Sequence, residues 1–179
     1  MNDQASASNC RLWTPDGFRD DFWRHSDSAE ALAGNDSVIL PLAAWLALDA
    51  TTRRAESGRI GVALAPGDDI AAIVDTLADI PLVALAFPGF ADGRSYSKAA
   101  LLRERHGYRG RLRATGQVLI DQIALMLRTG FDEFEVSHAA TLARLAAGRV
   151  GGLPVHYQPA AKGAPAAAGY AWRRLPAAS

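Results

Sequence analysis

The stretch from Phe87 to Val136, FPGFADGRSYSKAALLRERHGYRGRLRATGQVLIDQIALMLRTGFDEFEV, decides the fold of this chain. It opens at the end of an apolar run, Leu82–Phe87, and passes through two further alternations of strand-like and helix-like segments. Continuous apolar strands are typical of parallel sheets that are covered on both faces. The stretch therefore predicts repeated β-α units, with glycine, aspartate and arginine in the loops where such folds bind ligands.

The same alternation extends outward on both sides of this stretch. The predicted strands are 38–40, 59–64, 82–87, 111–114 and 131–136, with a further short strand at 150–157. One predicted helix starts at Pro41. The others cover 70–79, the segment from Ser95 or Ser97 to about His106, 117–129 and 138–147. About four β-α repeats result, which predicts an α/β fold with a parallel sheet of about four to five strands and crossover helices. An open three-layer sandwich and a partial (β/α) barrel both fit this spacing.

Three regions differ in composition. Residues 1–35 form a polar N-terminal arm, whose aromatic residues we expect to dock it onto the domain: Trp13, Phe18, Phe22 and Trp23. Residues 36–158 form a single α/β domain. Residues 159–179 form a tail rich in alanine and proline, with Tyr170 and Trp172 as candidate anchors.

Composition narrows the functional class. The chain has 179 residues, 49% of them hydrophobic, and a formal net charge of zero, so we expect a globular protein and no nucleic-acid partner. We expect the basic run of Arg103, Arg105, Arg109, Arg111 and Arg113 to be a solvated helix end plus strand arginines paired with acids. Without a signal-like N-terminus or an apolar run of about 18 residues, the expectation is a cytoplasmic protein with no membrane contact, and homo-oligomers stay possible.

Motifs for common cofactors are absent from the sequence. The single cysteine, Cys10, cannot form an internal disulfide or a redox pair. The four histidines lack metal-ligand spacing, so no metal site is expected, and there is no Walker A, GxGxxG or Gly-x-Ser-x-Gly sequence. The cofactor is therefore unknown, since no recognisable motif encodes one.

Both candidate architectures bind ligands at the carboxyl ends of their strands. Helix N-termini follow these loops, and their free N–H groups favour an anion. One prediction is therefore a small anionic ligand, with Arg94 as the clamp and Asp92 or His138 as the proton-transfer group. The alternative is a simple turn, in which Asp92 caps the helix and Arg94 pairs with it. The candidate anion-binding residues are Asp92, Gly93, Arg94, Arg113, Thr115, Gln117 and Asp121.

Strand alternation brings a second set of charges together. Arg111 and Arg113 point to one face of their strand, and Glu133 and Glu135 share a face of the next. If these strands are neighbours, Arg113 and Glu135 can pair. Such a pair is a structural ion pair, a group at an edge of the sheet exposed to water or, in a barrel interior, a group beneath the ligand face.

A multi-part string of residues resembles the bacterial family catalogued as domain of unknown function 934. It consists of Phe90, Asp92-Gly93-Arg94, Ser97, Leu102-Arg103, Gly107-Tyr108, Gly110, Leu112-Arg113-Ala114, Gly116, Asp121-Gln122, Gly130-Phe131 and Tyr157-Gln158-Pro159. The resemblance covers roughly residues 38–160. It implies genes encoded beside assimilatory sulfite reductase and a label of oxidoreductase involved in sulfite reduction, and it supplies no catalytic residue.

Three functions follow as hypotheses. The first is an accessory protein of assimilatory sulfate and sulfite reduction, which acts with sulfite reductase or its electron donor as an oxidoreductase component. The second is an enzyme that acts on a small anionic substrate at the strand carboxyl ends. The third is a non-catalytic scaffold. Whether the chain is an enzyme is open at this point.

Overall fold

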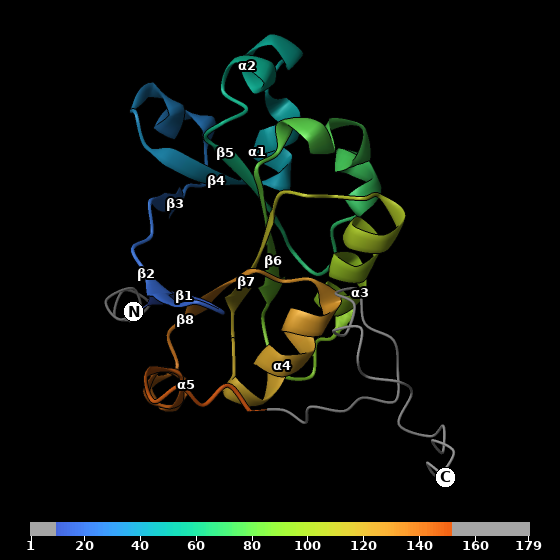
Figure 1. Cartoon of the computed structure of the whole chain (residues 1–179). Helices are drawn as coiled ribbons and strands as arrows, with labels where there is room; N and C mark the ends of the chain where they lie inside the picture. The colour runs from blue at the N-terminus through green and yellow to red at the C-terminus, as the bar shows by residue number, and fades with distance from the viewer. Residues whose placement is uncertain (1–9, 152–179) are drawn as a thin grey trace, which may run out of the picture.

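Residues 10–151 are described by a computed structural model of the chain, in which a curled sheet carries helices on one side (Figure 1). Within these residues the sheet has eight strands in the order β2-β1-β8-β7-β6-β5-β4-β3. The strands are β1 (Arg11–Thr14), β2 (Gly17–Arg19), β3 (Trp23–His25), β4 (Ser37–Pro41), β5 (Ile60–Leu64), β6 (Leu82–Phe87), β7 (Arg111–Gly116) and β8 (Glu133–Val136).

The sheet is larger than predicted and only partly parallel. From β3 to β8 all neighbours are parallel and follow one another in sequence order. The hairpin of β1 and β2 adds two antiparallel strands at the β8 edge, where Trp13 pairs with Phe134. The expected four to five parallel strands were therefore wrong, because segments of three or four residues at 11–25 are too short to show a strand periodicity.

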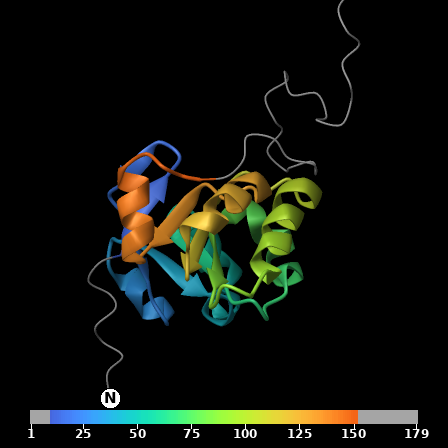
Figure 2. The ribbon, with the colours of Figure 1, turned by 90° about the horizontal axis from the view of Figure 1, so that it is seen from below.

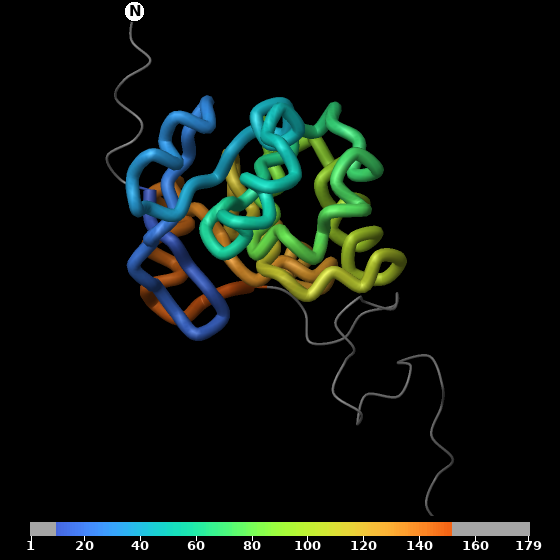
Figure 3. The backbone as a smooth tube through the Cα atoms, turned by 90° about the horizontal axis from the view of Figure 1, so that it is seen from above, coloured from blue at the N-terminus to red at the C-terminus, as the bar shows by residue number. Residues whose placement is uncertain are grey.

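The chain connection from β2 to β3 explains why the sheet curls. These strands lie at opposite ends of the sheet, so in a flat sheet about seven spacings of 4.8 Å, roughly 34 Å, would separate them. The three residues between Arg19 and Trp23 reach at most about 15 Å. The sheet therefore bends into a half-barrel, and the view from above shows the blue N-terminal hairpin beside the orange C-terminal part of the chain (Figure 3).

Helices cover the convex face of this half-barrel (Figure 2). They are η2 (Ala29–Ala33), α1 (Leu42–Ala47), α2 (Ala50–Ala55), η3 (Ile70–Asp79), α3 (Arg94–Ala100) with its continuation η4 (Leu101–Arg105), α4 (Ile120–Thr129) and α5 (Ala139–Ala146). Because sequential parallel strands joined by right-handed crossovers place every crossover on one side, a three-layer sandwich is excluded. The partial-barrel alternative describes the sheet.

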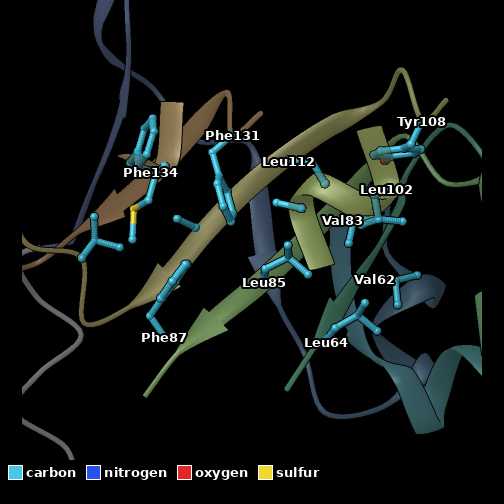
Figure 4. Packing of buried hydrophobic residues seen from close by; sticks show 14 of the residues in the cluster. Val62, Leu64, Val83, Leu85, Phe87, Leu102, Tyr108, Leu112, Phe131 and Phe134 are labelled. Carbon is cyan, nitrogen blue, oxygen red and sulfur yellow. The ribbon is translucent and has the colours of Figure 1, made fainter. Parts of the chain in front are cut away.

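Strand alternation divides the buried side chains between two faces. The convex face carries the main core, in which Val83, Leu85 and Phe87 of β6 pack beneath the helices. Figure 4 shows part of this core, with the Phe87 and Phe131 rings 5.7 Å apart between centroids. Burying a large apolar side chain contributes roughly 1.5–3 kcal/mol, so this layer is the main source of stability.

The concave face holds a smaller apolar cluster. It consists of Trp23, Ile39, Leu82 and Ala84, with Ala63 packed against them. Gly61 makes room for this cluster, since a Cβ atom there would lie 3.2 Å from the Trp23 ring and 3.1 Å from Leu82. Trp23, which we expected to dock the N-terminal arm, therefore fills the interior of the half-barrel.

The predicted helices are present, with differences in type and start. Segment 70–79 is a 3-10 helix, and Asp69 accepts a bond from the Ala71 N–H at its start (2.9 Å). The helix expected to begin at Ser95 or Ser97 begins at Arg94, because the Ser95 hydroxyl is buried and donates to the Ala86 carbonyl (2.6 Å). Gly130, with φ of 105°, ends α4 in the left-handed conformation that glycine adopts at little cost.

Within residues 10–151, no helix has the length and apolar character that crossing a bilayer requires. The last predicted strand and the tail at 159–179 lie outside the described residues, apart from Val150 and Gly151, which belong to no strand.

Candidate functional site

The loops at the carboxyl ends of the parallel strands adjoin one another along one edge of the sheet. The Gln117 N–H donates to the Phe87 carbonyl (2.7 Å), and the Gln122 side chain approaches the Phe90 carbonyl (3.5 Å). These bonds hold the loop after β6 against the loop after β7. Two of the loops predicted to bind a ligand are therefore in contact with each other.

Asp92 and Arg94 form a closed pair on this edge. Arg94 donates from Nε and Nη2 to the two Asp92 carboxylate oxygens (3.0 and 2.7 Å), and its backbone N–H also donates to Asp92 (3.2 Å). The hydrogen bonds from Arg94 hold the pKa of Asp92 below its ordinary value. Gly93 is the turn residue between them. This is the arrangement of the turn alternative, although Arg94 remains 61% exposed.

The other predicted residues of this edge lie apart from that pair and make structural contacts. Thr115 lies on the concave face near the end of β7, Gln117 is exposed in the following loop, and Asp121 is exposed in the first turn of α4. His138 is the N-cap of α5, where its Nδ1 accepts the Thr141 N–H (3.3 Å). Among residues 10–151, the hydrogen bonds of the Arg94 side chain go to Asp92 and not to these side chains, so the edge offers separate polar groups.

Arg113 lies away from this edge, in the middle of the concave face. It has no exposed side-chain surface and contacts three carboxylates: Asp21 (2.8 Å), Glu133 (2.8 Å) and Glu135 (3.0 Å). The predicted pairing of Arg113 with Glu135 is thereby confirmed. Burial lowers the pKa of Arg113, but bonds and charges from Asp21 and Glu133 outweigh it, and the net shift is upward. Arg113 is a permanent cation whose donors are already occupied.

Two further groups extend this charge cluster. Arg111 donates to Glu133 (3.2 Å), and its guanidinium also lies 5.3 Å from the centre of the Trp23 ring. His25, at the end of β3, contacts Glu135 through Nε2 (2.8 Å). Burial disfavours the ionised form of Glu135, but hydrogen bonds and charges from His25 and Arg113 outweigh burial and lower its pKa. We call Asp21, His25, Arg111, Arg113, Glu133 and Glu135 the concave-face cluster.

Residues 61–167 match a family described as bacterial proteins of unknown function, DUF934. The chain belongs to this family. No curated protein matches the sequence.

Only part of the concave-face cluster lies inside the region that matches DUF934. Arg111, Arg113, Glu133 and Glu135 lie inside the matched region, as do the loops of the carboxyl edge. Asp21 and His25 lie before it, Asp21 on the segment that leads into β3 and His25 at the end of β3. The matched region thus supplies the arginines and glutamates of β7 and β8, and the residues before it supply Asp21 and His25, which contact them.

Sequence reasoning missed Asp21 and His25 because their partners are distant in sequence. His25 and Glu135 are 110 positions apart, and Asp21 and Arg113 are 92 apart. A local signal does exist for His25, since Trp23 and His25 share a face of a strand. This shared face can be recognised only once residues 23–25 are known to form a strand.

Metal-ligand grouping, the Cys10 thiol and the His25 imidazole each bear on what the described residues can do chemically. Among residues 10–151, no three histidine, cysteine, aspartate or glutamate side chains are grouped so as to hold a metal ion. Burial raises the pKa of Cys10, and the charges of Glu135 and Asp21 raise it further, which disfavours the reactive thiolate. A bond to Glu135 raises the pKa of His25 despite the opposing effect of burial, which favours the protonated imidazole.

Proposed function

We propose that this DUF934 protein is an accessory protein of assimilatory sulfite reduction and acts beside sulfite reductase or its electron donor. The observation that carries the proposal is the family match over residues 61–167. The resemblance carried by Asp92-Gly93-Arg94, Leu112-Arg113-Ala114 and Asp121-Gln122 implies genes adjacent to those of sulfite reductase. A component encoded beside an enzyme complex commonly serves that complex.

An accessory role fits the chemistry of the chain better than independent reduction of sulfite. With one cysteine, the chain has no internal dithiol to cycle through a disulfide. That cysteine, Cys10, has a raised pKa, which makes its thiol a poor nucleophile at neutral pH. Electrons for sulfite would then pass through a partner or a borrowed cofactor.

We place the partner contact on the carboxyl edge of the sheet, around Phe90. This side chain is 65% exposed, although its loop is held in position by the bonds of Gln117 and Gln122. A large aromatic side chain on a fixed loop is the kind of residue that anchors protein interfaces. Asp92 and Arg94 lie in the same loop and supply charges at the rim of the contact.

A deletion strain tests the proposal. Without the gene, growth should fail or slow with sulfate or sulfite as the sole sulfur source and should be normal with sulfide or cysteine. Such a pattern assigns the defect to the reduction of sulfite. Equal growth of the mutant and the parent on sulfate and on sulfite would refute the proposal.

Two variants separate the accessory role from an enzyme of a small anion. Phe90→Ser should abolish co-purification of sulfite reductase or its electron donor, whereas the matched control Phe22→Ser, at a ring that is 78% exposed elsewhere, should not. Arg94→Ala removes only a charge at the rim of the contact, where charges contribute little to binding, so it should leave growth on sulfite intact if the role is accessory. Loss of growth in Arg94→Ala with co-purification preserved would instead support anion binding by Arg94.

A further inference from the structure

The residues Asp20 to His25 form a strap that joins the two ends of the sheet. They leave β2, which is the last strand at one end, and continue as β3, which is the last strand at the other end. Because this path is so short, the strap runs over the mouth of the half-barrel and not around its outside. Figure 1 shows this segment in blue, passing from β2 to β3.

One end of the strap is fastened by Asp21. Its carboxylate accepts two bonds from Arg113, at 2.8 and 3.0 Å, and a third from the backbone N–H of Trp23 (3.1 Å). The Trp23 side chain then enters the interior and is 8% exposed. Arg113 stays protonated at every pH that the protein would meet, so this fastening does not depend on a change in the charge of its arginine.

The other end of the strap is fastened by His25. Its Nε2 lies 2.8 Å from Glu135 on β8, and the His25 side chain is 48% exposed whereas Glu135 is 14% exposed. The charged groups that face this imidazole are Glu135 of β8, Arg113 of β7 and Asp21 of the strap itself. Two carboxylates and one guanidinium therefore surround a ring that is accessible to solvent protons.

We propose that the strap is a pH-sensitive latch, which His25 holds shut through an ion pair with Glu135 while the imidazole is protonated and holds more loosely, through a neutral hydrogen bond alone, when it is not. This loosening frees the carboxyl end of β3 and exposes Glu135 of β8. Asp21 keeps the other end attached to Arg113. The strap therefore opens as a hinged flap, with its fixed point at Asp21.

The direction of the pH response follows from the contact. The hydrogen bond to Glu135 raises the pKa of His25 in the folded protein, while burial and Arg113 oppose the rise. A raised pKa stabilises the closed strap fully below the ordinary histidine pKa of about 6.5, and this stabilisation is lost as pH rises through the folded value. The strap is closed in mildly acidic solution and loosens in mildly alkaline solution.

Amide hydrogen exchange of the full-length chain tests the latch. The reporter is the Ser26 N–H, which donates to the Ile39 carbonyl (3.1 Å) directly after His25. We expect its protection, corrected for the intrinsic exchange rate, to fall roughly two- to fivefold between pH 6 and pH 8.5, the range expected for a partly exposed ion pair. His25→Gln should remove this pH dependence, because glutamine can donate to Glu135 and does not titrate.

The matched control is His106→Gln, which changes a histidine at the end of η4, far from the strap in sequence, and should retain the wild-type pH dependence. Unchanged protection of Ser26 in the wild type, or a pH dependence that persists in His25→Gln, would overturn the proposal. A measurement that needs no variant is the NMR titration of the His25 ring. A pKa at or below about 6.5 would equally overturn it.

Discussion

Replacing Arg113 by methionine should destabilise the protein strongly, because it leaves three carboxylates on the concave face without their common cation. Arg113 has no exposed side-chain surface, whereas Asp21, Glu133 and Glu135 are 29%, 8% and 14% exposed. Removing one partner of a buried ion pair costs about 3–5 kcal/mol. We expect about 3 kcal/mol, the lower end of that range, since Glu133 keeps Arg111 and Glu135 keeps His25.

Urea denaturation at pH 7 and pH 5 measures this loss of unfolding free energy. In thermal denaturation, the melting temperature of a chain of this size should fall by about 6–12 °C. In the wild type, bonds from His25 and Arg113 lower the pKa of Glu135, so its contribution is present above the unfolded value and is lost as pH falls through the lowered value. In Arg113→Met, Glu135 loses this cation and its pKa rises. The difference between variant and wild type should therefore shrink at pH 5.

Two controls separate this effect from a general loss of an arginine. Arg109→Met, at an exposed loop position, should change the free energy of unfolding by less than about 0.5 kcal/mol. Adding Glu133→Gln and Glu135→Gln to Arg113→Met should recover part of the loss, because the uncompensated charges are then removed. A loss below about 1 kcal/mol in Arg113→Met, or one of equal size at both pH values, would refute the reasoning.

Three further changes probe contacts at the ends of the strands, each by urea denaturation; Gly116 and Thr141 lie at the carboxyl edge, and Tyr108 lies at the amino ends of β6 and β7. Gly116→Ala should cost about 2–4 kcal/mol, because φ is 85° and the new Cβ would lie 2.6 Å from the Phe87 carbonyl oxygen; a cost near zero would show that the loop relaxes freely. Tyr108→Phe should cost about 1–2 kcal/mol, since the buried Ile80 carbonyl loses its 2.9 Å donor, and an unchanged midpoint would contradict this. Thr141→Val should cost a similar amount, about 1–2 kcal/mol, by removing the hydroxyl that joins the starts of α4 and α5, whereas Thr141→Ser should retain most of the stability.

The central strands were predictable because their residues are apolar on both faces. The predicted bounds of β6, Leu82–Phe87, agree with the structure, since both neighbours and both faces bury this strand. The N-terminal strands were not predictable. Within 10–25 they have three or four residues each, and their polar residues are explained by partners that the sequence places far away.

Among the charged residues, too, some contacts were predictable from the sequence and others were not. The pairing of Arg113 with Glu135 follows from alternation on adjacent strands, and the structure confirms it at 3.0 Å. Asp92 and Arg94 are two positions apart, so their pairing could be expected from the sequence. Whether Arg94 binds Asp92 or a ligand depends on loop geometry, which the sequence does not show. Arg103 illustrates the remaining difficulty, since it binds the Tyr108, Gly110 and Gly130 carbonyls, which only the folded chain brings together.

The position of the hairpin at the β8 edge has a consequence for the order of events during synthesis. Among the strands of residues 10–151, β1 leaves the ribosome first and its partner β8 leaves it last. His25 and Glu135 are 110 positions apart, which corresponds to roughly 5–20 seconds of translation. During that interval the parallel units can assemble in chain order, each on its predecessor, while the hairpin has no sheet edge to join. The N-terminal residues therefore wait, and the arrival of β8 completes the sheet and draws them across its mouth.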